Sequence, residues 1–194
     1  STSEYVRDRR FKAHCVAVAR GSEGFVPRLI RHADIQAYFD TIDWSKVRLV
    51  AHNMLFDGFV LAEIYGKRPA EYFCTQAAAR HWERGRCRHS LDALCKLHGL
   101  KMKPKGVLDE TKGLDEIPDE MWARFSEYAT HDVLSCLVLY QIYKDRIVPS
   151  ERKLMTTTFR MFCDPVFEGD LSLIRESFHD ALQERILKIV AGNV

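Results

Sequence analysis

The sequence predicts a mixed α/β fold in which helices flank a sheet and a helical tail follows. Two largely apolar segments near the start, the first of them rich in valine and small residues, are separated by the turn Gly21–Gly24, which indicates a hairpin. A third apolar segment, Arg48–Ala51, leads directly into an amphipathic stretch, which is typical of a strand followed by a helix. Residues 149–194 contain helical patterns and no obvious strand. Strands that come early and alternate with helices later favour a mixed sheet.

The first third of the chain supplies the hairpin. A polar helical turn is expected over Thr2–Arg10, before strands at Phe11–Ala19 and Phe25–Ile30. Pro27 cannot donate a ladder hydrogen bond, so the second strand is expected at a sheet edge. Asp34 is a candidate N-cap for a short helix.

The middle of the chain is expected to be mostly helical. A helix after Ala51 ends near Tyr65, where Gly66 follows, and Ser90 caps another helix. The region Lys101–Pro118 shows little periodicity and is expected to be a loop. The other expected elements are a short strand at Tyr72–Thr75 and helices over Gln76–Glu83, Leu91–His98, Pro118–Phe125 and His131–Ile147.

The tail carries two helical patterns, Glu151–Phe162 and Leu171–Val190, interrupted at Cys163–Val166. We therefore expect one domain over residues 1–148 and a helical tail over residues 149–194. No apolar run approaches the ~18 residues of a membrane span, and no signal peptide is evident. The six cysteines are expected to be reduced, which favours a cytoplasmic protein of a bacterial or phage-infected cell.

Two polar stretches are the candidates for chemistry. Asp57 lies where the strand Arg48–Ala51 passes into a helix, at the sheet edge where open α/β folds bind ligands. Tyr128 and Asp132 are four residues apart, on one helical face if the helix is continuous. Taken singly, each aspartate could simply complement a helix dipole and Tyr128 could be a core aromatic. Together they favour phosphodiester hydrolysis by two hard cations ~3.5–4 Å apart, held by carboxylates from separate elements.

The two stretches resemble motifs of a known family. Ala51–Asp57 is similar to the second exonuclease motif, and Tyr128–Asp132 to the third, of the proofreading 3′–5′ exonuclease domain of family A DNA polymerases. That domain belongs to the ribonuclease H-like superfamily. The resemblance covers about Glu4–Val148, and Leu154–Val166 resembles the linker to the polymerase domain. A variant with a histidine base would place it at Glu127, so the tyrosine form applies.

The resemblance implies a role for each matched residue. Asp57 and Asp132 would bind two divalent ions, Mg²⁺ or Mn²⁺, and Tyr128 would orient the attacking water. His52, Asn53, Phe56, Arg80 and Lys105 are the expected substrate-binding residues. The implied substrate is the 3′ end of single-stranded DNA, and a polymerase domain is the implied partner.

One family motif has no counterpart. The first motif is Asp-x-Glu on the first strand, and no such pair precedes Phe11. Glu4 and Asp8 lie in a polar turn and are not candidates. Either the strand lies in a missing N-terminal segment or the domain has lost half of its ligands. We favour the first explanation because the rest of the pattern is intact.

Charge supports a nucleic-acid partner. Between Arg80 and Lys105 there are eight basic and two acidic residues, a local excess of six positive charges in a chain of net charge +2. Such a segment can follow a phosphate backbone with salt-dependent affinity, although a solvated helix face would look the same. Cys87-x-His89 and Cys95-x-x-His98 contain zinc-ligand types, but the first spacing is unusual and no zinc is expected.

Two rival functions remain open at this level. One is a catalytically inactive DNA-binding or polymerase-docking module on the same fold. The other is an RNA exonuclease, which would differ in contacts to the 2′-hydroxyl.

Overall fold

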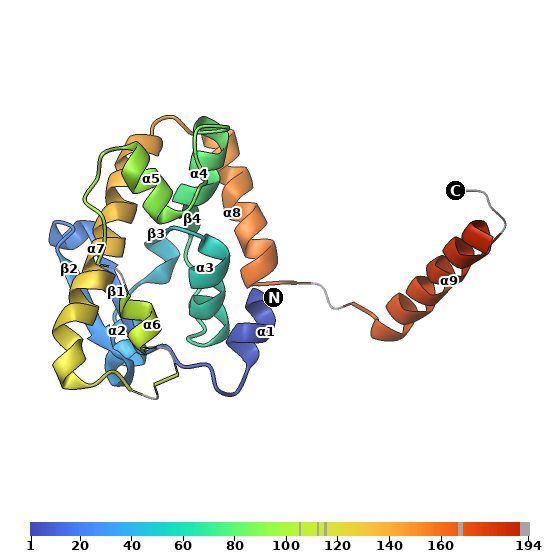
Figure 1. Ribbon diagram of the computed structural model, residues 1–194, viewed down its shortest axis with the longest axis horizontal. Coiled ribbons are helices and arrows are strands. Elements are labelled where there is room, and N and C mark those ends of the chain that lie inside the picture. Colours follow the sequence, from blue (N-terminus) through green and yellow to red (C-terminus); the bar gives the residue numbers. More distant parts are fainter. Residues whose placement is uncertain (105, 112, 115, 167–168, 191–194) are drawn as a thin grey trace. The chain divides into compact units, whose positions relative to one another are not determined.

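The computed structural model describes residues 1–104, 106–111, 113–114, 116–166 and 169–190. It divides into two compact units, Ser1–Asp164 and Pro165–Val194. The first unit is a mixed α/β structure with small sheets and many helices, as predicted, and it is shown with the second in Figure 1.

The first sheet is an antiparallel hairpin. Strand β1 (Cys15–Ala19) pairs with β2 (Pro27–Arg31), so that Cys15 faces Arg31 and Ala19 faces Pro27. A 3₁₀ turn and Gly24, with φ of 69°, connect the strands. β2 pairs with β1 alone, so the edge position predicted from Pro27 is confirmed for the described residues.

The second sheet is parallel. Strand β3 (Arg48–Ala51) begins and ends where the sequence predicted, and it pairs with β4 (Glu71–Cys74) through the crossover helix α3 (Met54–Glu63). An ion pair with 2.6 Å between Arg48 and Glu71 joins the starts of the two strands. Among the described residues β1 is not hydrogen-bonded to β3, so the expected mixed sheet consists of two separate pairs of strands.

The remaining helices of the first unit surround these strands. They are α1 (Thr2–Arg7), α2 (Ile35–Asp40), α4 (Thr75–Trp82), α5 (Leu91–Leu97), α6 (Val107–Thr111), α7 (Asp119–Tyr143) and α8 (Pro149–Cys163). Helix α7 lies against β1, β2 and β3, whereas α8 packs on α3 and β4 (Figure 1). Both pairs of strands therefore share α7 as their cover.

Two helices differ from the sequence prediction. The patterns at Pro118–Phe125 and His131–Ile147 belong to one continuous helix, α7, because no proline or glycine interrupts the intervening residues. The expected loop over Lys101–Pro118 contains α6, where the Thr111 hydroxyl donates a 3.0 Å hydrogen bond to the Val107 carbonyl. Both of these residues are buried, so tertiary packing stabilises a helix that its sequence alone does not predict.

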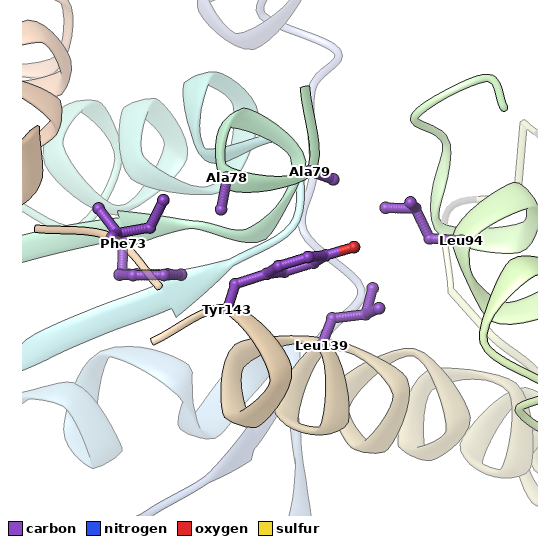
Figure 2. Packing of buried hydrophobic residues seen from close by; sticks show 7 residues of the cluster. Phe73, Ala78, Ala79, Leu94, Leu139 and Tyr143 are labelled. Carbon is purple, nitrogen blue, oxygen red and sulfur yellow. The ribbon is translucent and has the colours of Figure 1, made fainter. Parts of the chain in front are cut away.

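The largest core cluster lies where α4, α5 and α7 meet β4. Figure 2 shows the ring of Tyr143 among Phe73, Ala78 and Leu139, with Leu94 near its hydroxyl end. The hydroxyl group donates a 3.3 Å hydrogen bond to a carboxylate oxygen of Glu83, which is only 1% exposed. The core therefore fixes the C-terminal end of α7 against the parallel sheet. Because α7 is continuous, this contact also keeps the middle of the helix near β3.

Helix α8 lies beyond residue 148, where the sequence placed the end of the exonuclease-like domain. Its side chains Phe159 and Cys163 are buried in the first unit, and Cys163 joins the cluster of Val6 and Phe59. The compact unit consequently extends to Asp164. The apolar face of α8 completes the core that α1 and α3 begin.

The second unit contains α9 (Leu171–Val190), whose limits match the predicted helix. All of its residues are exposed within the structure. None of the helices over the described part of the chain is long and apolar enough to cross a membrane.

Replacing Gly58 with Ala tests the contact between α3 and α8. A Cβ atom there would lie 3.0 Å from Cys163 Sγ and 3.4 Å from Tyr72 Cε1. Alanine would normally stabilise a helix by ~0.5–1 kcal/mol, but overpacking costs ~1–3 kcal/mol, so we expect a net loss of ~1 kcal/mol in urea unfolding. The double change Gly58→Ala with Cys163→Ala should recover part of that loss. A more stable single variant would contradict this packing.

Candidate active site

Asp57 lies in the first turn of α3, directly after β3. The preceding Asn53 adopts a left-handed conformation with φ of 62°, which allows the chain to turn sharply from the strand into the helix. Crowding by surrounding protein raises the pKa of the Asp57 carboxyl to about 7, and the charge of Asp132 adds to the rise. Residue Asp57 is nevertheless exposed to solvent. Asp57 thus has a raised pKa, caused by the surrounding protein and by Asp132, at a position that solvent can reach.

Asp132 and Tyr128 lie one turn apart in the middle of α7, on the same face of the helix. Tyr128 helps to hold down the pKa of the Asp132 carboxyl, and 31% of the Asp132 side chain is exposed. Burial raises the pKa of Asp132, although Lys103 opposes the rise. Since the charge of Asp132 also acts on Asp57, the structure brings the two predicted motifs into one neighbourhood.

Lys103 completes this cluster. Its Nζ atom lies 2.9 Å from the Tyr128 hydroxyl oxygen and 3.2 Å from Asp132 Oδ1. The same ammonium group lies 4.7 Å from the centroid of the Tyr128 ring. Burial alone would lower the pKa of Lys103, but hydrogen bonding to Tyr128 and the charge of Asp132 raise it above its ordinary value.

Sequence reasoning missed Lys103 as a site residue. It counted Lys103 only as part of the basic segment and selected Lys105, which lies outside the described residues. No local pattern distinguishes Lys103 from the exposed Lys101 nearby, because both lie in a segment without periodicity. Only the approach of this segment to α7 reveals the contact.

His52 has two hydrogen-bond partners, one on each ring nitrogen. Its Nδ1 atom lies 2.9 Å from the Thr75 hydroxyl, and its Nε2 atom lies 3.1 Å from the carbonyl oxygen of His89. Burial lowers the pKa of His52, and the charges of Lys103 and Arg80 lower it further. The ring therefore ties the end of β3 to α4 and lies within electrostatic reach of two cations of the basic segment.

The other predicted substrate residues occupy different surroundings. Asn53 is exposed beside the start of α3, and Arg80 is exposed on α4, where it donates a 3.2 Å hydrogen bond to Gln76. Phe56 packs against the rings of Tyr5 and Phe11, with centroids 6.3 and 6.4 Å away. The structure thus gives Phe56 a packing contact with the N-terminal segment.

The acidic residues of the N-terminal segment pair locally. Glu4 accepts hydrogen bonds from the N-terminal amino group and forms a capping box with Ser1. Asp8 binds Arg10 at 2.7 Å on the surface. Neither carboxylate therefore replaces the Asp-x-Glu pair of the resembled family.

The chemistry of the donor set fits one hydrated divalent ion. Asp57 and Asp132 offer hard oxygen ligands, and Mg²⁺ commonly binds through one or two carboxylates, with water and substrate phosphate as the other ligands. Over the ranges that the structure describes, no group of three or more His, Cys, Asp or Glu side chains could hold a metal ion. A second ion would require further oxygen ligands.

The basic segment is largely open to solvent. Six of its basic side chains are exposed: Arg80, Arg84, Arg86, Arg88, Lys96 and Lys101. Its acidic residue Glu83 is buried and paired with Arg86 at 2.5 Å. The exposed surface of this segment is consequently almost entirely positive.

The residues weighed as zinc ligands have other partners or surroundings. Cys95 is buried beside Leu94 in α5, and the Nε2 atom of His98 lies 2.9 Å from the Tyr143 hydroxyl. All six cysteines are unpaired in the structure.

Comparison with known proteins gives the family. A family model described as 3′–5′ exonuclease, of the type found in A-type DNA polymerases, matches residues 1–147. No curated protein and no solved structure matched the chain. The matched range contains both resembled motifs and Lys103, and the mixed α/β structure is consistent with the ribonuclease H-like fold of such domains. The chain belongs to the 3′–5′ exonuclease family of the family A DNA polymerases.

Proposed function

We propose that the protein is a metal-dependent exonuclease domain that removes nucleotides from the 3′ ends of single-stranded DNA beside a polymerase. One observation carries this proposal: Asp57 lies near Tyr128 and Asp132, although the two motifs are far apart in the sequence. Asp57 and Tyr128 are separated by 71 positions. The match to the exonuclease family supports it.

Each residue has a distinct task in this proposal. Asp57 and Asp132 would hold a divalent ion, which would supply charge neutralisation at the scissile phosphate and would lower the pKa of water. The Tyr128 hydroxyl, which accepts a 2.9 Å hydrogen bond from Lys103 beside Asp132, would orient the attacking water toward the phosphorus. The exposed cations of the basic segment attract the phosphate backbone, so binding should weaken as salt rises.

The remaining ligands would come from outside this sequence. The family pattern places two carboxylates on an Asp-x-Glu strand, and no such pair precedes Phe11. In the described structure β1 and β3 each pair on one side only, so each offers an edge to which a further strand can add. We therefore propose that full activity needs a further segment, from an N-terminal extension or a polymerase partner.

A non-catalytic role is the rival, and one observation favours it. The described residues lack a cluster of three metal-ligating side chains, while the positive segment remains exposed. A domain with these properties would bind single-stranded DNA and dock a polymerase without cleaving.

Digestion of 5′-labelled single-stranded DNA distinguishes the two functions. The chain is assayed alone and joined to a segment that carries an Asp-x-Glu strand, in magnesium and in EDTA. Shortening from the 3′ end that requires magnesium supports the nuclease. Binding to DNA without shortening in both forms of the protein supports the rival.

Replacing Tyr128 with Phe is expected to lower the cleavage rate by roughly 10²-fold in the form that cleaves, because the hydroxyl that orients water is lost. The ring and its packing remain, so folding should be unchanged. Tyr140→Phe is the matched control. Tyr140 also lies on α7, its hydroxyl accepts a 3.2 Å hydrogen bond from Arg48 of β3, and the rate of this variant should stay within about twofold of wild type. Equal rates for the two variants would remove Tyr128 from the mechanism.

A further inference from the structure

Lys103 is the cation that lies beside Asp132 in the candidate site. Its Nζ atom lies 3.2 Å from Asp132 Oδ1 and 3.5 Å from Oδ2, so it faces both oxygens of that carboxylate. Its side chain is 21% exposed, and the ring of Tyr128 lies 4.7 Å from the ammonium group. The group is therefore held beside Asp132 by three interactions rather than extended into solvent.

A divalent ion and this ammonium group need the same oxygen atoms. Mg²⁺ binds carboxylate oxygens at about 2.0–2.1 Å, on the side where their lone pairs are free. An ammonium group 3.2 Å from Oδ1 uses part of that space and repels a second cation. It also compensates for the mutual repulsion of Asp57 and Asp132, which is evident from the effect of Asp132 on the pKa of Asp57.

The displaced lysine has another carboxylate within reach. Asp92 Oδ1 lies 3.6 Å from the same Nζ atom, and the Asp92 side chain is 54% exposed. A lysine stem is flexible, with rotatable bonds along four carbons. A small movement therefore transfers the ammonium group from Asp132 toward Asp92 without leaving it unpaired.

We propose that Lys103 is a resident counter-cation that neutralises Asp132 in the metal-free protein and competes with a divalent ion for it. This inference rests on the proposed function, because it assumes that Asp132 is a metal ligand. Lys103 is then a positioning residue: it keeps Tyr128 and Asp132 in place before metal binding and moves toward Asp92 afterwards. The metal affinity of the site is lowered as a result.

Titration of the chain with Mn²⁺ tests the competition without any need for activity. Lys103→Met keeps an unbranched stem of similar length beside the Tyr128 ring but removes the charge. We expect its Mn²⁺ dissociation constant to fall roughly fivefold, since one nearby positive charge has been removed in a partly solvated site. Lys101→Met is the matched control on an exposed lysine of the same segment, and it should bind within about twofold of wild type.

Thermal unfolding gives an independent result. In EDTA, Lys103→Met should unfold at a lower temperature than wild type, because Asp132 loses its counter-charge. Saturating Mn²⁺ should then raise its unfolding temperature by more than it raises that of wild type. If Lys103→Met does not fold, Lys103→Gln is used in the same titration, and Lys103→Arg should not bind Mn²⁺ more tightly than wild type.

Two failures can be told apart with Asp132→Asn. Suppose that wild type binds Mn²⁺ and that Asp132→Asn weakens this binding. If Lys103→Met then binds Mn²⁺ no more tightly than wild type, the counter-cation inference is overturned and the proposed function still stands. If Asp132→Asn binds Mn²⁺ as wild type does, Asp132 is not a ligand and both proposals fail. Tighter binding by Lys103→Met but not by Lys101→Met is the supporting result.

Discussion

Replacing Asp132 with Asn is expected to lower the rate of 3′-end cleavage by about a thousandfold or more. Loss of one electrostatic stabiliser costs ~3–4 kcal/mol of transition-state stabilisation, and a metal ligand contributes at least as much. Asparagine keeps the shape and one oxygen of the side chain. The variant therefore removes the charge that holds the ion while leaving the surrounding contacts in place.

The fold should survive this change. Burial raises the pKa of Asp132, which means that its charged form is disfavoured by its surroundings despite Lys103. Circular dichroism and urea unfolding should consequently show a stability within about 1 kcal/mol of wild type. The rate is measured with 5′-labelled single-stranded DNA in magnesium, on the form that carries all metal ligands.

Asp145→Asn is the control for Asp132→Asn. Asp145 is an exposed aspartate just beyond the end of α7, so its replacement should leave cleavage within about twofold of wild type. An Asp132→Asn protein that cleaves as fast as Asp145→Asn would refute the assignment of Asp132. A loss of rate accompanied by unfolding would instead be attributed to structure, and Mn²⁺ binding would then decide the role.

Local sequence signals were sufficient for the elements that position Asp57. The apolar run Arg48–Ala51 has short length, branched side chains and polar flanks, and β3 occupies that range in the structure. The position of Asp57 in the first turn of α3 follows from the same pattern. The spacing of Tyr128 and Asp132 also sufficed, because four residues along a helix always return to one face.

Contacts between distant segments could not be predicted from local sequence patterns. Lys103 approaches Tyr128 and Asp132 across 25 and 29 positions in sequence, from a segment with no periodicity. The packing of α8 on α3 and β4 likewise depends on Phe159 and Cys163 filling a space that other elements create. Tertiary packing determines these contacts, and the residue pattern within one segment does not reveal them.

The division of the strands into two pairs has the same origin. Hydrophobic periodicity identifies strands but does not state which edges pair. β1 and β3 both contact α7, yet neither is hydrogen-bonded to the other. The sequence pattern alone therefore located the four strands, although β1 begins at Cys15 rather than Phe11, and it joined them into one sheet.

Asp57→Asn is expected to abolish cleavage and, in the same protein, to stabilise the metal-free fold. The pKa of Asp57 is about 7 in the folded chain, against an ordinary value of 3.8. Between these values the folded chain keeps a proton that the unfolded chain has released, so stability falls as pH rises from about 4 to 7. Above about pH 7 the carboxylate is charged in both states and the full penalty remains.

The size of this effect is limited by solvent. A shift of ~3 units would correspond to ~4 kcal/mol in a dry site, but Asp57 is exposed to solvent, so we expect a gain of ~1 kcal/mol for Asn at pH 8. Loss of a negative charge in the first turn of α3 offsets this by a few tenths of a kcal/mol. Near pH 4 the two proteins should differ little.

Urea unfolding in EDTA at pH 4.5 and pH 8 measures this dependence directly. The advantage of Asp57→Asn should grow between the two pH values, and added Mg²⁺ should raise the stability of wild type more than that of the variant. A variant that is less stable than wild type at pH 8 would show that the Asp57 charge is compensated in the metal-free fold. A carboxylate can destabilise the fold when no cation is bound and still be retained, because a bound cation neutralises its charge. Residues at functional sites are kept for ligand binding rather than for stability.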